Sequence, residues 1–144
     1  MSKSKVAVQL YTLRDLLKTP AEIRDTLKKV KKIGYNAVQV SGIGPIDPKE
    51  LKEILVKTKL YPCSVHIDYE KIIKEPEKVL EESKILGYET IVCPGLAQEF
   101  QNAEELKKVA KELSKVGELF KKNGFILAYH NHAWELESFK GKTG

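Results

Sequence analysis

The stretch Phe125-Ile126-Leu127-Ala128-Tyr129-His130-Asn131-His132-Ala133-Trp134-Glu135 joins two parts of opposite chemistry. Its first part is an apolar run that fits a buried strand, and its second part holds two imidazoles, an amide, an indole and a carboxylate. Polar groups of this kind gain nothing from burial without partners. Side chains at i and i+2 of a strand point to the same side, so we expect His130 and His132 to face one way with Glu135 close behind. The stretch therefore predicts a ligand or acid/base cluster at a strand end, and the simpler alternative is a pair of histidines bonded to backbone or water.

Four further apolar runs of strand length precede this one, and amphipathic stretches separate them. These expected strands cover residues 6–10, 37–40, 63–67 and 90–93. Helix starts are expected at Thr19-Pro20-Ala21-Glu22, at Asp47-Pro48-Lys49-Glu50 and between Asn102 and Glu105, where a capping side chain precedes helix-forming residues. Pro76 is expected to break the helical stretch that follows the third strand.

Three helix-to-strand joints carry the same pair of residues, a glycine followed by an aromatic: Gly34-Tyr35, Gly87-Tyr88 and Gly124-Phe125. They indicate repeated units of βαβ size and hence a parallel α/β sheet covered by helices. A flavodoxin-like open sheet and the N-terminal portion of a TIM barrel remain in competition. The first strand is not followed by a glycine-rich phosphate loop, which favours the barrel. A whole barrel needs about 250 residues, so residues 1–144 are expected to form a single partial (β/α) barrel domain with five strands.

Composition excludes several classes of function. The net charge is +5, but the positive charge is mostly lysine scattered among glutamates, with Arg14 and Arg24 as the only arginines, which argues against nucleic-acid binding. No apolar stretch is long enough to span a bilayer, and residues 1–5 lead into a strand without a signal-peptide core, so a cytoplasmic location is expected. Cys63 and Cys93 fit neither a disulfide framework nor a metal-binding spacing.

Polar side chains recur at the carboxyl ends of the expected strands: Gln9, Gln39, His66 and His130. Parallel α/β architectures bind their ligands at this edge. With these positions in view, the sequence resembles the xylose-isomerase-like barrel superfamily, in particular its sugar phosphate isomerase/epimerase branch. The resemblance rests on 8–14 at the first strand, 34–39 at the second, His66 at the end of the third, and 129–135 at the fifth.

The resemblance implies a divalent metal at the mouth of the barrel. Many relatives carry a Glu-Asn-His-like pattern on the fifth strand, and here His130 stands in the place of the Glu, followed by Asn131 and His132. His130 is therefore the expected metal ligand, and its imidazole favours Mn, Co or Zn over Mg. A departure from the pattern is Ala133, where members of this branch often carry Asp.

The implied reaction is proton transfer next to the carbonyl of a sugar or sugar phosphate through a metal-stabilised enediolate. The residues expected to be catalytic are His66, His132 and Glu135, and those expected to bind substrate are Gln9, Gln39, Asn131 and Trp134. Three alternatives stay open: a non-catalytic metal- or sugar-binding remnant, a purely structural remnant, and a lyase (dehydratase) of the same superfamily.

The resemblance places the remaining metal ligands on strands six to eight, which this sequence lacks. The chain is accordingly expected to be a fragment or a shortened gene product with weak or no turnover by itself. Its first and fifth strands would be unpaired edges beside apolar side chains meant for the barrel interior, which predicts self-association.

Overall fold

A computed structural model describes residues 6–96 and 103–136, and its described strands form one parallel sheet in the order β1-β2-β3-β4-β5. The strands are β1 (Val8–Gln9), β2 (Ala37–Val40), β3 (Tyr61–His66), β4 (Thr90–Pro94) and β5 (Ile126–His130). Each strand pairs in parallel with the next along the chain. A flavodoxin-like sheet would instead place its first strand between the second and third. The order confirms the predicted incomplete barrel.

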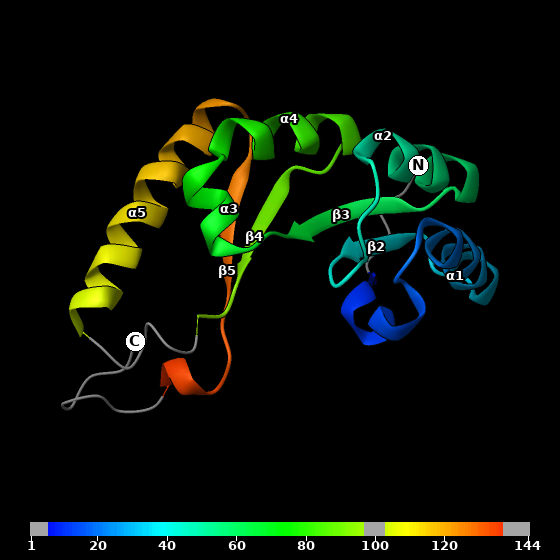
Figure 1. The fold of residues 1–144 in the computed structure, drawn as a ribbon, viewed down its shortest axis with the longest axis horizontal. Helices are drawn as coiled ribbons and strands as arrows, with labels where there is room; N and C mark the ends of the chain where they lie inside the picture. The colour runs from blue at the N-terminus through cyan, green and yellow to red at the C-terminus, as the bar shows by residue number, and fades with distance from the viewer. Residues whose placement is uncertain (1–5, 97–102, 137–144) are drawn as a thin grey trace.

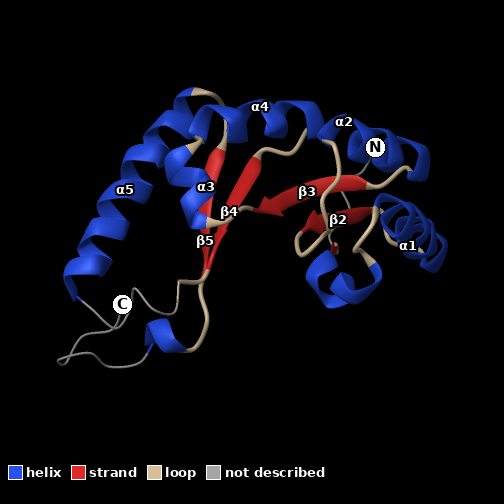
Figure 2. Ribbon diagram, viewed as in Figure 1, coloured by secondary structure: helices blue, strands red, loops and turns tan. Residues whose placement is uncertain are grey.

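Helices connect the strands and cover one side of the sheet. They are α1 (Pro20–Ile33), α2 (Pro48–Thr58), α3 (Tyr69–Lys74), α4 (Pro76–Leu86) and α5 (Ala103–Lys122), with 3₁₀ turns η1 (Leu10–Leu16) and η3 (Trp134–Leu136). Figure 1 shows α1, α2, α4 and α5 following one another around the outside of the strands. Figure 2 shows the alternation of strand and helix that makes parallel pairing possible.

The predicted helix boundaries rest on local chemistry and are largely confirmed. At the start of α1, the hydroxyl of Thr19 accepts a hydrogen bond from the backbone N–H of Glu22, whose carboxylate accepts one from the N–H of Thr19. At the start of α2, the carboxylate of Asp47 accepts hydrogen bonds from the backbone N–H groups of Lys49 and Glu50, and Pro76 separates α3 from α4. The third expected cap begins at Asn102, which lies outside the described residues.

The glycines of the three joints have left-handed backbones, with φ of +117° at Gly34, +82° at Gly87 and +83° at Gly124. Residues with a Cβ rarely adopt this conformation, so glycine ends each helix and turns the chain back to the sheet. The repeated glycine–aromatic pair thus marks a repeated backbone geometry.

The core lies between the sheet and its helices. Leu27 on α1, Val38 on β2, Leu55 on α2, Ile91 on β4 and Phe120 on α5 are all almost fully buried in one continuous cluster. Because successive side chains of a strand point to opposite faces of the sheet, the residues next to these core residues lie on the face away from the helices. No helix among the described residues is long and apolar enough to cross a membrane.

Two strands, β1 and β3, differ from the sequence prediction by more than one residue at one end. β1 holds only Val8 and Gln9 of the expected residues 6–10, because the chain turns into η1 at Leu10, which is fully buried. β3 begins two residues earlier than predicted, at Tyr61, and includes Pro62. An irregularity in the register with β2 leaves Cys63 without a ladder partner, and prolines are tolerated in strands beside such bulges.

Candidate functional site

A polar row crosses the face of the sheet that the helices leave free. Val38 and Val40 point into the core, so Gln39 between them points to the opposite face. The side-chain amide of Gln9 donates to the side-chain oxygen of Gln39 over 2.9 Å, and the amide of Gln39 donates to the Ser64 hydroxyl over 2.9 Å. The parallel register sets these residues side by side. The two glutamines expected to bind substrate thus hold each other in place.

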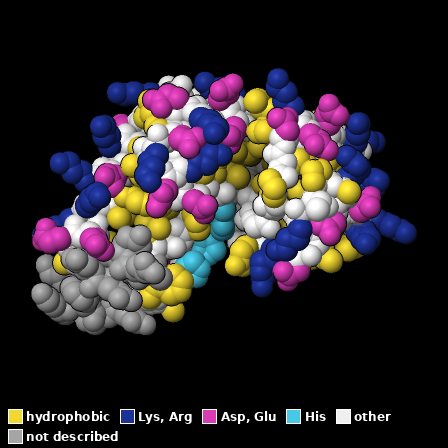
Figure 3. Space-filling view, viewed as in Figure 1, with side chains coloured by type: hydrophobic (Ala, Val, Ile, Leu, Met, Phe, Trp, Pro, Cys, Tyr) yellow, Lys and Arg dark blue, Asp and Glu magenta, His cyan; other side chains and the backbone are white. Residues whose placement is uncertain are grey.

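The histidines continue this polar surface at the carboxyl ends of β3 and β5. Nδ1 of His130 lies 3.4 Å from Nε2 of His66, although the two residues are 64 positions apart in the chain. They meet because β4 pairs with both strands, with Val92 opposite His66 and Pro94 opposite His130. Figure 3 shows the histidine side chains gathered in a hollow near the middle of one face of the molecule.

Four rings form a continuous ladder at this hollow. The rings of His66 and His130 meet at 73° with centroids 5.0 Å apart. His132 stacks on His130 at 4.7 Å, and Trp134 stacks on His132 at 4.1 Å. The structure therefore brings together the three histidines and the tryptophan that were expected to act at one site. Asn131 lies exposed at the rim.

The ladder has an electrostatic consequence for His66. Burial lowers the pKa of its imidazole, and the neighbouring rings of His130 and His132 lower it further because each disfavours a second positive charge. A histidine with a lowered pKa is neutral at pH 7 and keeps a nitrogen lone pair available.

Glu135 lies apart from the open surface. It is only 4% exposed, and its carboxylate accepts hydrogen bonds from the Tyr129 hydroxyl at 2.8 Å and from the backbone N–H of His132 at 2.7 Å. Burial raises the pKa of Glu135, but these hydrogen bonds outweigh burial and leave the pKa below its usual value. Both oxygens are thus engaged within the protein. This arrangement gives Glu135 a positioning role for the loop that carries His132.

Sequence reasoning missed a glycine on which this arrangement depends. A Cβ on Gly95 would lie 2.2 Å from Nδ1 of His132 and 3.1 Å from the carbonyl oxygen of His130. Only a residue without a side chain lets the His132 ring pack against this turn. The signal in the sequence was the Pro94-Gly95 pair after the fourth strand, which indicated a turn but not the ring that covers it.

A cleft of about 520 Å³ opens beside His66 at the ends of β2 and β3. Its wall includes Tyr11, and Arg14 lies over that ring at 4.6 Å. Gly42 has a φ of +62°, and a Cβ there would lie 2.7 Å from the Tyr11 ring. The cleft is large enough for a small molecule and borders the histidine ladder at one end.

The described residues of the site offer some of the nitrogen ligands that a metal ion such as Zn²⁺ accepts, but not a full set. Two imidazole nitrogens, from His66 and His130, face one gap. Within residues 6–96 and 103–136, no group of three or more His, Cys, Asp or Glu side chains is arranged to hold an ion. A bound metal would therefore keep positions open for water or substrate.

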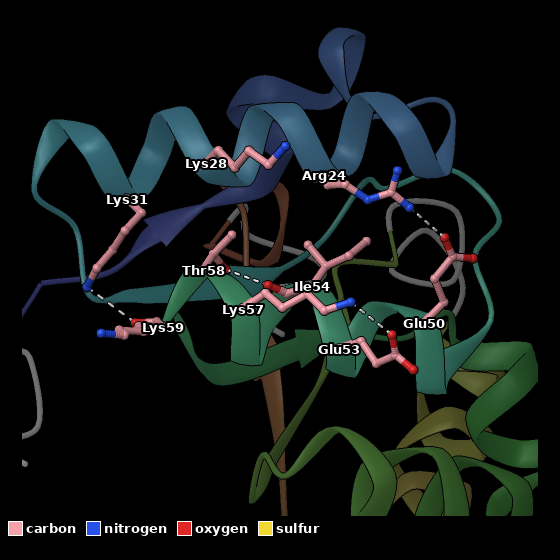
Figure 4. A pocket seen from close by; sticks show the side chains of 9 residues that line it. All are labelled: Arg24, Lys28, Lys31, Glu50, Glu53, Ile54, Lys57, Thr58 and Lys59. Atoms are coloured by element: carbon pink, nitrogen blue, oxygen red, sulfur yellow. Dashed lines mark hydrogen bonds and ion pairs between the residues drawn. The ribbon is translucent and has the colours of Figure 1, made fainter.

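A groove of about 650 Å³ between α1 and α2 lies on the helical side of the molecule. Figure 4 shows its charged side chains, among which Arg24 pairs with Glu50 at 3.1 Å and Lys57 with Glu53 at 3.3 Å. Exposed pairs of this kind are typical of a solvated helix surface. We therefore place the candidate site at the histidine ladder.

No family model matches the sequence, and no curated protein matches it. Solved structures do match its fold. A sugar phosphate isomerase/epimerase from Parabacteroides distasonis has a TM-score of 0.72 and 20% identity, over 92% of this chain and 56% of its own. A probable 3-DHS dehydratase from Bacillus anthracis has a TM-score of 0.66 and 12% identity, over 90% and 53%. A family 2 AP endonuclease from Brucella melitensis has a TM-score of 0.66 and 10% identity, over 85% and 53%.

These comparisons show that the chain has the fold of part of a TIM barrel, as the sequence predicted. The three solved proteins are named for an isomerase or epimerase, a dehydratase and an endonuclease, so the shared fold covers different reactions. The chain spans about half the length of each of these structures.

Proposed function

We propose that the histidine ladder binds a divalent metal and a small sugar or sugar phosphate, and that it serves proton transfer next to the sugar's carbonyl group. The observation that carries the proposal is the meeting of His66, His130 and His132 at the carboxyl ends of two strands, beside an open cleft. Ligand sites of parallel barrels lie at this edge. This chain covers only 56% of the matching isomerase/epimerase structure, so the proposed activity would also need residues from the part that this chain does not span.

In this proposal His130 holds the metal. A metal bound there would polarise a carbonyl oxygen and would stabilise negative charge on it. Imidazole ligands suit Mn, Co and Zn better than Mg.

His132 is the proposed proton-transfer residue. It is exposed, and its ring lies between those of His130 and Trp134, which fixes its orientation. A positioned histidine imidazole is the side chain that most often accepts and returns a proton in general acid–base catalysis. Glu135 supports this role indirectly, because it holds the backbone N–H of His132.

The row of Gln9 and Gln39 and the exposed Asn131 supply amide groups for sugar hydroxyls along the same surface. Each glutamine already bonds to a neighbour, so its orientation is set before a ligand arrives. The ring of Trp134 supplies an apolar surface beside them.

Exchange of substrate hydrogen with solvent deuterium tests this function directly. The chain is incubated in D₂O with Mn²⁺, Co²⁺ or Zn²⁺ and a panel of ketoses and their phosphates, and NMR follows the hydrogen on the carbon next to the carbonyl. We expect slow exchange with the unaltered chain and with Lys28→Ala, a control on the distant α1 surface, and exchange slower by about a hundredfold or more with His132→Ala, the lower end of what general acid–base catalysis contributes. Absence of exchange across the panel would refute the catalytic proposal.

A non-catalytic binding function is the second candidate. Its support is the burial of Glu135, because a carboxylate bonded within the protein is not available for proton transfer. His132 is then the one exposed acid–base side chain of the ladder. Saturation-transfer NMR that detects sugar binding without deuterium exchange would favour this candidate. A dehydratase begins with the same proton removal, so loss of water from the product would distinguish it from an isomerase.

A further inference from the structure

We propose that the open edge of β5 and the adjoining face of α5 form a twofold interface with a second copy of this chain. In this dimer β5 pairs antiparallel with β5 of the second copy, and α5 lies beside α5 of the second copy on the same side of the joined sheet. Figure 1 shows α5 running alongside β5 at one end of the curved sheet. The interface does not depend on the metal or the sugar of the proposed function.

The backbone of β5 is open on the side away from β4. Ile126 donates its backbone N–H to the carbonyl oxygen of Glu89 over 2.8 Å, on the β4 side. Backbone groups of successive residues in a parallel strand point to opposite neighbours, so the N–H and C=O of Leu127 point to the edge. Strand edges of this kind pair readily with other strands. The opposite edge strand, β1, holds only two residues, so β5 is the edge suited to pairing.

A groove of about 550 Å³ runs between α5 and this edge, and Gly117 and Leu127 line it. Gly117 lies within a 20-residue helix, where glycine is less stable than alanine. Among the described residues, a Cβ on Gly117 would come no closer than 3.8 Å to any atom, so packing within the chain does not require a glycine there. A bare backbone at this place instead lets a second helix approach closely.

The charges of the groove complement themselves under a twofold rotation. Glu118 and Lys121 both line the groove and are exposed. Within the described parts of the chain, neither side chain takes part in an ion pair. Antiparallel packing of α5 against its copy brings Glu118 of each chain within reach of Lys121 of the other. A twofold dimer therefore gains this pair twice.

One axis satisfies the strand and the helix together. The atoms nearest to a Cβ on Gly117 belong to Leu127, at 3.8 Å and 3.9 Å, so the two residues lie at the same height along the edge. A twofold axis at that height opposes Leu127 to Leu127 of the second copy, and the two residues exchange both of their N–H···O bonds. The same axis opposes the two Gly117 backbones. It also sets Ile126, which is 60% exposed, against Ala128 of the second copy.

A further stretch of a longer polypeptide is the competing occupant of this edge. The chain covers 56% of the matching isomerase/epimerase structure, and a complete barrel continues past its fifth strand. The second copy is the better match to the groove because it brings an identical open edge and the opposite charge to each charged side chain. Twofold dimers are also the commonest assemblies of identical chains.

Charge reversal tests the interface in analytical ultracentrifugation of the untagged chain. We expect dimers and no larger species, since a twofold interface closes on itself. Glu118→Lys and Lys121→Glu should each raise the dissociation constant of the dimer by about tenfold or more, because each change makes two attractive pairs repulsive. An equimolar mixture of the two variants should restore dimers to within about threefold of the unaltered chain, because opposite charges then face each other. Lys122→Glu, in the same last turn of α5 but outside the groove, is the matched control and should leave the dimer unchanged.

Circular dichroism checks that each variant folds, and the double variant Glu118→Lys/Lys121→Glu, which reverses both charges, should form dimers if a single variant fails to fold. A monomer at all concentrations would overturn the proposal and would favour the longer polypeptide as the occupant. Dimers that are equally stable in all variants would overturn it as well. Exchange of the Leu127 amide hydrogen, followed by NMR, should slow as the dimer forms. A constant exchange rate would overturn the pairing through β5.

Discussion

Replacing Tyr129 by phenylalanine removes a hydroxyl group that joins three segments of the site. The backbone N–H of Leu96 donates to this hydroxyl over 2.9 Å, and the hydroxyl donates to the carboxylate of Glu135 over 2.8 Å. The other oxygen of Glu135 accepts from the N–H of His132 over 2.7 Å. The turn after β4, the strand β5 and the turn η3 are thus tied together through one phenol.

The magnitude follows from these two bonds. A hydrogen bond to a charged group contributes about 1.5–3 kcal/mol and a neutral one about 0.5–1.5 kcal/mol. Because Tyr129 is 36% exposed, water replaces part of what is lost. We therefore expect Tyr129→Phe to lower the free energy of unfolding by about 1.5–3 kcal/mol.

Urea unfolding of Tyr129→Phe, Glu135→Gln and the double variant measures both the loss and its origin. If the two side chains stabilise each other directly, the double-mutant cycle should show a coupling of about 1 kcal/mol or more. Tyr61→Phe is the matched control, because Tyr61 is 40% exposed and no hydrogen bond of its hydroxyl is found among the described residues. The control should stay within about 0.5 kcal/mol of the unaltered chain.

A Tyr129→Phe variant as stable as the Tyr61→Phe control would refute this reasoning. Strictly additive effects of Tyr129→Phe and Glu135→Gln would also contradict it, because they would mean that the two groups do not depend on each other.

Three further outcomes are expected. Gly95→Ala should cost about 1–3 kcal/mol of stability by pushing the His132 ring aside, and should change the fluorescence of Trp134, the single tryptophan; an unchanged spectrum would contradict this. Because the folded protein lowers the pKa of His66, the unfolded chain binds more protons below about pH 6.5, so stability should fall with decreasing pH through that window. Urea midpoints should show a flatter pH dependence for His66→Gln, and an equal slope would argue against it. Self-association through the edge of β5, where Ile126 is 60% exposed, should appear in analytical ultracentrifugation and weaken in Ile126→Lys. A soluble monomer at all concentrations would contradict this.

The sequence by itself determined the helix starts, the helix ends and the type of sheet. The cap at Thr19, the left-handed glycines at Gly34 and Gly87, and the alternation of apolar runs with amphipathic stretches are local signals. Each depends on residues a few positions apart, and so can be recognised without knowing the fold. The polar strand ends also indicated the edge of the sheet at which the candidate histidines lie.

Only the tertiary structure decided how the residues of the candidate site are arranged. His66 and His130 come within 3.4 Å because two separate ladders to β4 set their strands in register. Glu135 follows His132 by three residues, yet the fold buries its carboxylate against Tyr129 and turns it away from the open surface. Gly95 matters only because a ring from another strand end covers it. Contacts of this kind depend on register and packing between distant segments, and no local pattern in the sequence encodes them.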